Sequence, residues 1–189
     1  KYGADNVLVT DSGDCLQGSP LASFTHKLPE EEGLRKFTEA YNEVGYDARA
    51  LGNHDFNYGL DYLSYYVDNN RTPFINDNVL DAETNVPFFG KEYTIIEKAG
   101  LKIGIMGITT QYISHWESED HIKGLKFVSG YDVLSKLAKK LRPQVDILCA
   151  MYHGGFESDP LTGEATEPHT GENEGYKILT EIPEIDVFL

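Results

Sequence analysis

An asparagine and a histidine stand side by side in the stretch LGNHDFNYG at residues 51–59. Asn53 offers a neutral amide oxygen and His54 an imidazole, and both groups are ligands for divalent metals. Because adjacent residues in an extended turn point in different directions, Asn53 can face a metal while His54 faces a substrate. Gly52 and Gly59 allow the backbone to turn sharply and a ligand to approach closely. The stretch therefore predicts a turn that carries a metal ligand and a substrate-facing side chain.

Two further side chains of the same chemical kind follow apolar stretches elsewhere in the chain. Asp14 lies in SGDCLQG and His153 in YHGG. In open α/β sheets, ligands bind beyond the carboxyl ends of the strands, so these two residues and the Asn53-His54 pair are expected to gather at one sheet edge. A carboxylate that bridges two cations, with an amide and an imidazole, suits a metal-bound phosphate, because two ions stabilise both the attacking and the leaving oxygen.

Each of these residues also has an ordinary structural interpretation. Asp14 could be an Asx-turn residue, Asn53 a loop cap and His153 a core histidine with satisfied hydrogen bonds. His54 could be an ordinary turn residue. Asp14 by itself would fit the ordinary interpretation better, whereas its occurrence together with the other three favours a site.

The apolar pattern of the chain indicates the elements that position these side chains. Strands alternate with amphipathic helices, which is typical of a mostly parallel sheet layered with helices, and a Lys-Ala-Gly turn inside one long apolar run adds an antiparallel hairpin. The predicted strands are 6–10, 46–51, 72–77, 92–108 (the hairpin), 145–155 and 184–189, and the predicted helices are 30–44, with acids in its first turn, 59–69, 130–143 and 173–181.

Length and charge limit the classes of function. A chain of 189 residues suits one domain with an ordinary core. Its net charge of −15 argues against binding a nucleic-acid polymer or an anionic membrane through a basic surface, although bound cations would still permit an anionic substrate. No apolar run approaches the roughly 20 residues that span a bilayer.

Cys15 and Cys149 fall in or beside predicted strands and are expected to be small buried side chains.

Three ordered motifs resemble those of the calcineurin-like metallophosphoesterases: SGDCLQG, LGNHDF and YHGG. The longer stretches GDCLQGSPL, LGNHDFNYGLDYL and LKIGIMGI are similar to the bacterial 5′-nucleotidase and 2′,3′-cyclic-nucleotide 2′-phosphodiesterase branch. The resemblance covers nearly the whole chain. It implies an α/β fold, a four-layer α/β/β/α sandwich with mixed sheets that is incomplete at both ends.

The resemblance also implies a role for each candidate residue. Asp14 becomes the carboxylate that bridges two metals, Asn53 and His153 become ligands of the second metal, and His54 contacts the phosphate and the leaving oxygen. The implied cofactors are two divalent ions, with manganese favoured over zinc, iron or cobalt, and the implied reaction is attack on a nucleotide phosphoester by a metal-bridging hydroxide. Asn57 stands where mononucleotide-cleaving relatives have Asp, which resembles the cyclic-nucleotide diesterase subgroup; Asn57 can orient the His54 ring but cannot supply a charge.

Two family motifs are not in this sequence. One is Asp-x-His on the opening strand, and the other is Gly-His-x-His (or Gly-His-x-Gln), which the resemblance places just after Leu189. Residues 1–189 are therefore expected to be a partial catalytic domain without the C-terminal nucleoside-binding domain, and weak or inactive as an isolated piece. Relatives are often exported, which favours the cell envelope or the medium, with the cytoplasm as the alternative.

Other interpretations stay open at this point. The chain could be a binding or regulatory module that kept the fold and lost catalysis, or an acidic calcium-binding surface protein, although no D-x-[DN]-x-[DN]-G loop is found. The tyrosines of 62–69 could pack a helix on the sheet or form a base platform, and the loop 157–176 could be a lid or a solvated acidic loop. Trp116 could line a cleft. The remaining histidines are expected on the surface, in polar loops without partners at ligand spacing: His26, His115, His121 and His169.

Overall fold

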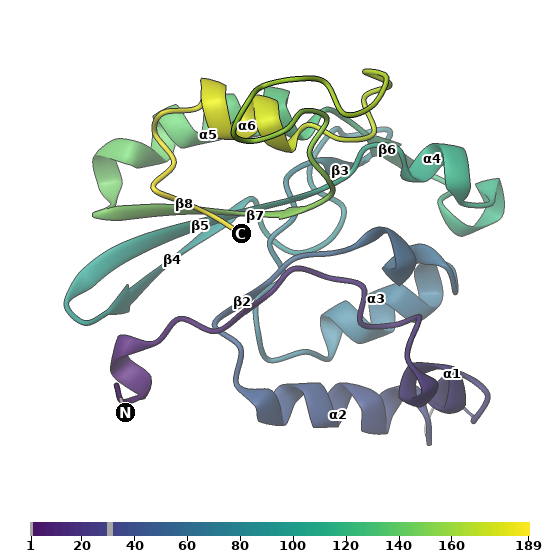
Figure 1. The fold of residues 1–189 in the computed structure, drawn as a ribbon. Coiled ribbons are helices and arrows are strands. Elements are labelled where there is room, and N and C mark those ends of the chain that lie inside the picture. Colours follow the sequence, from purple (N-terminus) through teal and green to yellow (C-terminus); the bar gives the residue numbers. More distant parts are fainter. Residues whose placement is uncertain (1, 30–31) are drawn as a thin grey trace.

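The computed structural model describes residues 2–29 and 32–189, and it has the predicted four layers (Figure 1). The first sheet and the second sheet lie face to face, and helices cover the outer side of each. The first helix layer is α1 (Pro20–His26), α2 (Leu34–Val44) and α3 (Leu60–Asp68), and the first sheet is β1 (Thr10–Asp11) and β2 (Ala48–Arg49). The second sheet is β4 (Tyr93–Lys98), β5 (Leu101–Thr109), β7 (Ile147–His153) and β8 (Val187–Phe188), and its helices are α5 (Gly130–Leu141) and α6 (Gly175–Glu181).

Smaller elements complete the fold. A separate antiparallel pair joins β3 (Val79–Asp81) to β6 (Leu125–Phe127), and the short helix α4 spans Ile113–Trp116. Short 3₁₀ turns cover Ala4–Asn6, Asn53–Phe56, Glu119–His121 and Arg142–Gln144.

The second sheet is mixed, as expected. Its strand order is β4-β5-β7-β8, with β5 antiparallel to β4 and parallel to β7. The predicted hairpin is confirmed, and its turn places Ala99 and Gly100 at positive φ of 53° and 76°. In the first sheet, β1 pairs with β2 in parallel, and a single bridge from Arg49 to Phe74 extends the pairing to the segment after α3.

Strand β7 is buried on both faces, which explains why its sequence is continuously apolar. Leu148 and Ala150 pack toward α5 and α6, whereas Cys149 and Met151 pack toward the first sheet. Cys149 is thus the small buried side chain that was predicted, and burial raises the pKa of its thiol to about 11. The residues between the two sheets are Ala48, Ala50, Ile75, Ile103, Ile105, Cys149 and Met151.

The other cysteine is less completely covered than predicted. Cys15 is partly buried, and its Sγ atom lies 3.1 Å from the Tyr66 hydroxyl. Both cysteines are free thiols.

A buried arginine joins the first sheet to its helices. Arg49 is fully buried, and its guanidinium group contacts Asp11 at 2.6 Å and the Asn70 side chain at 2.9 Å. Such a cation is tolerated because it is paired, and because aromatic ring faces attract it. Four ring centroids lie 4.7–5.2 Å from its Cζ atom, those of Tyr41, Tyr46, Tyr66 and Phe74. Of the tyrosines of α3, Tyr66 lies in the core, and Tyr62 and Tyr65 are partly buried against it, so the helix packs through this face, as the first interpretation of 62–69 had it.

Several boundaries differ from the predictions. Strand β1 covers Thr10–Asp11 in place of 6–10, and β2 covers only Ala48–Arg49. Helix α2 begins at Leu34, so the prediction of acids in its first turn is wrong; part of that predicted stretch lies outside the described residues. Helix α1 was missed, although Ser19 caps it by accepting a hydrogen bond from the Ala22 N–H at 3.0 Å and Pro20 occupies its first turn.

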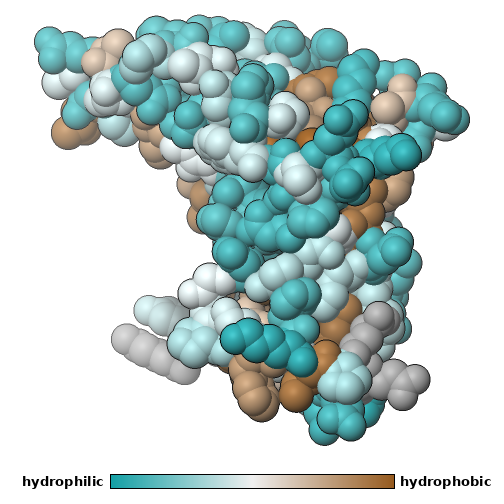
Figure 2. Space-filling model, turned by 90° about the vertical axis from the view of Figure 1, so that its right-hand side faces the viewer, coloured by the Kyte–Doolittle hydropathy of each residue, from teal (hydrophilic) through white to brown (hydrophobic). Residues whose placement is uncertain are grey.

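One face of the molecule shows how polar and apolar residues are distributed over the surface. The face seen in Figure 2 is mostly hydrophilic, and some of its hydrophobic residues show at the lower end, where α1 and α2 lie. Among the side chains of α1, Leu21 and Phe24 are exposed. Among the helices of the described residues, none is long and apolar enough to cross a bilayer.

A candidate metal and phosphoester site

Asp14, Asn53 and His153 meet in space, as their positions after apolar stretches predicted. The Nε2 atom of His153 lies 3.2 Å from Oδ2 of Asp14 and 3.1 Å from Oδ1 of Asn53. The side chains of Asp14 and His153 are 28% and 23% exposed, so the group is partly covered yet reachable from solvent.

The prediction of one sheet edge is wrong, because the three residues come from two sheets. Asp14 and Asn53 follow β1 and β2 of the first sheet, whereas His153 is the last residue of β7 in the second. Their side chains nevertheless touch, so the site lies where the two layers meet. The carbonyl of Ser12 accepts a hydrogen bond from Nδ1 of His153 at 2.8 Å, which joins the layers and leaves Nε2 facing Asp14 and Asn53.

A buried carboxylate, Asp55, holds the loop of Asp14 against the turn of Asn53. It accepts hydrogen bonds from the backbone N–H groups of Asp14, Leu16 and Gly52 at 2.9–3.1 Å. Burial raises the pKa of Asp55, while these three donors act in the opposite direction. The GNHD motif contains Asp55, but its anchoring role was not predicted, because the donors from the first loop lie far away in sequence.

Close approach of two glycines brings the same loops together. Gly13 has φ of +103°, and a Cβ on it would lie 2.1 Å from the backbone nitrogen of Gly52. Asp14 itself has φ of +66°, a conformation that few residues other than glycine adopt and that is common at functional sites. Its Oδ1 atom accepts a hydrogen bond from the His54 N–H at 2.8 Å. The backbone conformation and this bond together aim the Asp14 carboxylate at His153.

The charges of Asp14 and His153 favour each other. Burial alone would raise the pKa of Asp14, but the hydrogen bond and charge of His153 outweigh it, and the pKa of Asp14 is lowered. Burial alone would lower the pKa of His153, but Asp14 and the Ser12 carbonyl outweigh it, and the pKa of His153 is raised. Asp14 is therefore ionised at neutral pH, as a metal-binding carboxylate must be.

The donor set fits a divalent ion. Adjacent ligands of an octahedral ion, each at about 2.1 Å from it, lie about 3 Å apart. The separations of 3.2 Å and 3.1 Å among these oxygen and nitrogen atoms are therefore close to what such an ion requires. Over residues 2–29 and 32–189, no group of three or more His, Cys, Asp or Glu side chains could hold a metal ion. The group described here has two such side chains, and its third donor is the amide of Asn53.

His54 lies beside this group and faces a pocket. Its Nδ1 atom is 2.7 Å from Oδ1 of Asn57, so the predicted pairing of His54 with Asn57 is present. The pocket has a volume of about 350 Å³, and Trp116, half-exposed, forms part of its wall, as the sequence suggested. The lining residues are Asn53, His54, Asn57, Ile113, Trp116 and Glu117.

The remaining histidines lie at the surface, but three of them have partners that were not predicted. His26 ends α1 and stacks on Tyr58 with ring centroids 3.6 Å apart, and His115 stacks on Tyr112 at 3.8 Å. His121 contacts the Glu117 carboxylate at 2.9 Å. His169 is exposed in the acidic loop.

The loop 157–176 is tied down at both ends. The buried carboxylate of Glu157 accepts hydrogen bonds from the N–H groups of Tyr176 and Lys177 at 3.0 Å and 2.8 Å, which closes the loop onto the start of α6. Glu174 accepts from Gly130 N–H at 2.8 Å and thereby caps α5. The ends of this acidic loop thus have a structural role.

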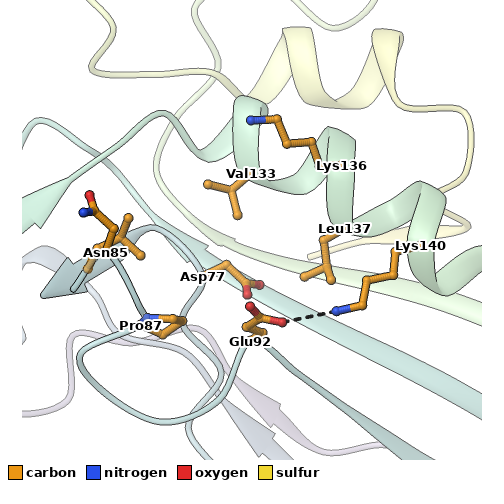
Figure 3. Close-up of a pocket in the computed structure, with 9 residues that line it drawn as sticks. Asp77, Asn85, Pro87, Glu92, Val133, Lys136, Leu137 and Lys140 are labelled. Carbon is orange, nitrogen blue, oxygen red and sulfur yellow. Dashed lines mark hydrogen bonds and ion pairs between the residues drawn. The ribbon is translucent and has the colours of Figure 1, made fainter.

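A second pocket lies between α5 and the segment 77–92 (Figure 3). The Asp77 and Glu92 carboxylates point toward each other in it, and Lys140 contacts Glu92 at 3.4 Å. None of the predicted site residues lines this pocket, so it is separate from the candidate centre.

Comparisons with known proteins identify related sequences and structures. No family model matches the chain. A 2′,3′-cyclic-nucleotide 2′-phosphodiesterase/3′-nucleotidase of Salmonella typhimurium is 32% identical over 97% of the chain, and one of Yersinia enterocolitica is 30% identical over 98%. The chain spans 29% of the length of each, less than a third.

Solved structures show the same likeness. A Staphylococcus aureus protein assigned as a 5′-nucleotidase, solved in complex with alpha-ketoglutarate, superposes with a TM-score of 0.88 and 34% identity over 96% of this chain and 35% of its own. The calcineurin-like phosphoesterase YfkN of Bacillus subtilis superposes with a TM-score of 0.76 at 24% identity, over 96% of this chain and 56% of its own, and shows the shared fold.

The fold is that of the calcineurin-like phosphoesterases, and the chain belongs to that family. Within the family, its homologues are the 2′,3′-cyclic-nucleotide 2′-phosphodiesterase/3′-nucleotidases and the 5′-nucleotidases.

Proposed function

We propose that this chain carries part of the catalytic centre of a metal-dependent nucleotide phosphoesterase. The observation that carries the proposal is the convergence of Asp14 and Asn53 on His153, at 3.2 Å and 3.1 Å, directly beside His54. Homology to nucleotide phosphoesterases supports it and does not favour a lapsed binding module.

Each side chain has a role in this proposal. Asp14, Asn53 and His153 would hold divalent ions, with manganese preferred for their mixed oxygen and nitrogen donors. Such ions, when bound, neutralise phosphate charge and activate water for attack at phosphorus. His54 has its Nδ1 atom engaged by Asn57, so its Nε2 atom is left for the phosphate and the leaving oxygen. It would stabilise the transition state or donate a proton to the leaving oxygen.

The proposed substrate class is the 2′,3′-cyclic nucleotides, with 5′-monophosphates as the second candidate. Asn57 supports this choice, and so do the relatives that match 97–98% of the chain, whose names include the cyclic-nucleotide activity. The 5′-nucleotidases of Vibrio match a smaller share, 79% and 84%, whereas the Staphylococcus aureus protein assigned as a 5′-nucleotidase matches 96% and keeps 5′-monophosphates as the second candidate.

Residues 1–189 are proposed to be one portion of this catalytic domain. The family resemblance assigns further metal ligands to an Asp-x-His motif and a Gly-His-x-His motif, and assigns nucleoside binding to a C-terminal domain. The short span relative to the curated relatives supports this. On this proposal the isolated piece holds metal weakly and is a feeble enzyme.

The test uses the full-length protein with 2′,3′-cyclic AMP and 5′-AMP, with manganese or with chelator. We expect hydrolysis that chelation stops, and a kcat/KM at least about tenfold higher for the cyclic substrate. Asp14→Ala should abolish both activity and tight metal binding, because this carboxylate is the proposed bridge between two ions. Asp61→Asn, an exposed change on α3, is the control. Undiminished turnover by Asp14→Ala would refute the proposed centre, and a tenfold preference for 5′-AMP would refute the substrate class.

A further inference from the structure

Asn57 bridges His54 to a carboxylate that the sequence did not indicate. Its Oδ1 atom lies 2.7 Å from Nδ1 of His54, and its Nδ2 atom donates to Oε2 of Glu117 at 2.5 Å. Glu117 is 60 residues away in the chain. The three side chains form one hydrogen-bonded row that ends at the pocket beside the proposed metal ligands.

Glu117 is held firmly for this contact. Its side chain is 9% exposed, and it follows α4 with its own N–H bonded to the Ile113 carbonyl at 2.9 Å. Its other oxygen, Oε1, accepts from the Ser118 N–H at 2.8 Å and contacts Nδ1 of His121 at 2.9 Å. Oε1 is thus occupied by two neighbours, and Oε2 is left for Asn57.

This arrangement fixes which way the Asn57 amide points. A carboxylate only accepts hydrogen bonds, so the NH₂ group of Asn57 must face Glu117 and its carbonyl oxygen must face His54. The reverse orientation would place two acceptor oxygens against each other. With the Asn57 oxygen as acceptor, His54 carries its hydrogen on Nδ1, and Nε2 faces the pocket.

We propose that Glu117 is a positioning residue that sets the orientation and tautomer of His54 through Asn57. Glu117 supplies the carboxylate that Asn57 itself lacks, one hydrogen bond further from His54. The catalytic consequence rests on the proposed role of His54, whereas the effect on the imidazole does not. In serine proteases a comparable loss of tautomer control lowers kcat about 10⁴-fold although the residues stay in place.

The first experiment replaces Glu117 with Gln, which has almost the same shape. The Gln oxygen should stay with the two donors near Oε1, so its NH₂ group faces Asn57 and turns that amide around. The neutral His54 ring should then move its hydrogen from Nδ1 to Nε2. Nitrogen-15 NMR of the imidazole detects this at about pH 8.5, where an ordinary histidine is neutral, and His54→Ala assigns the signal. We expect kcat to fall about tenfold or more with little change in KM.

The second experiment exchanges the amide at position 57 and the carboxylate at position 117. Asn57→Asp alone places two carboxylates in contact and should lower activity, whereas Asn57→Asp with Glu117→Gln restores a row in which Gln donates to Asp and Asp accepts from His54. The double variant should recover the Nδ1–H tautomer and more activity than either single variant. Glu119→Gln, an exposed acid of the neighbouring turn, is the control and should change neither signal nor rate.

The outcomes separate this proposal from the proposed function. An unchanged His54 spectrum in Glu117→Gln, or a double variant no better than Asn57→Asp, would overturn the positioning role. If no phosphoester is hydrolysed but the spectra change and recover as described, then the positioning role stands and the proposed function fails.

Discussion

The place of a Gly52 side chain is already taken by Asp14. A Cβ atom on Gly52 would lie 2.2 Å from Oδ1 of Asp14 and 2.6 Å from its backbone nitrogen. The glycine before the Asn-His pair therefore has a specific purpose, namely to let the carboxylate of the first loop lie directly against the second loop. Gly52 also donates its N–H to Asp55 at 2.9 Å, so its backbone cannot easily move away.

Gly52→Ala should therefore damage the site more than the fold. We expect the Asp14 carboxylate to be displaced, with metal affinity and turnover both lowered at least about tenfold and stability lowered by about 1–3 kcal/mol. Metal titration calorimetry and urea unfolding measure the two effects. Gly45→Ala is the control: it ends α2 at φ of +76° with open space around it, so it should cost about 1 kcal/mol and leave metal binding intact. Unchanged metal affinity in Gly52→Ala would contradict the proposed role of Asp14.

His54→Ala should separate catalysis from metal binding. His54 contacts Asn57 by its ring and Asp14 by its backbone N–H alone, so removal of the ring leaves the three proposed ligands in place. We expect kcat to fall about 10²–10⁴-fold while the metal content stays constant. Elemental analysis beside steady-state kinetics tests this, with His169→Ala as an exposed control. Loss of metal together with activity would make His54 a ligand.

Asp77 should make stability depend on pH. The residue is 3% exposed and lines the pocket of Figure 3, and burial, aided by Glu92 and opposed by the Gly107 N–H and Lys140, raises the pKa of its carboxyl group well above the ordinary 3.8. The unfolded chain keeps the ordinary pKa of 3.8, and the folded protein has the raised pKa. Between these two pKa values the folded state holds a proton that the unfolded state has lost. The free energy of unfolding therefore falls as pH rises through that interval.

Asp77→Asn removes this dependence, since an amide does not ionise and its oxygen can still accept from Gly107. Relative to the wild type, the variant should gain stability as pH rises, by at most about 1.4 kcal/mol per pH unit. Urea unfolding across a pH series gives the difference curve, with Asp61→Asn as the exposed control. A flat difference would mean that Asp77 has the same pKa in both states.

Arg49→Ala should be among the most destabilising single changes in the chain. It would leave Asp11 without its buried partner and open a space among four aromatic rings. Breaking a buried pair in this way costs about 3–5 kcal/mol. Arg35→Ala removes an exposed pair with Glu39 and should cost less than about 1 kcal/mol. Similar melting temperatures for the two variants would show that the buried cation contributes little.

The sequence predicted those features that depend on local pattern. The hairpin of β4 and β5 and the burial of β7 follow from runs of apolar residues, whereas the four-layer sandwich was implied by the family resemblance. The grouping of Asp14, Asn53 and His153 followed from a rule about strand ends together with a family resemblance. The division of these residues between two sheets did not follow, because periodicity says nothing about which strands share a sheet.

The residues that were not predicted contact partners that lie far away in the sequence. Glu117 stands in a polar stretch that supported no prediction for it, and Arg49 was only an interior position of a short predicted strand. Each acquires its role from partners that packing alone brings near, at sequence separations of 60 for Glu117 with Asn57 and 38 for Arg49 with Asp11. A buried charge among tyrosines carries no periodic signal, so only the folded arrangement reveals it.

The bond between His153 and the Ser12 carbonyl has a consequence for the order of folding. It spans 141 residues, and the contact of His153 with Asn53 spans 100. Contacts of such separation form late, because a long loop must close before they contribute anything. During synthesis, Asp14 and Asn53 can come together while β7 is still to be made. The imidazole joins them only when the second sheet docks on the first, so the three proposed metal ligands form a set only after the two halves of the domain have come together.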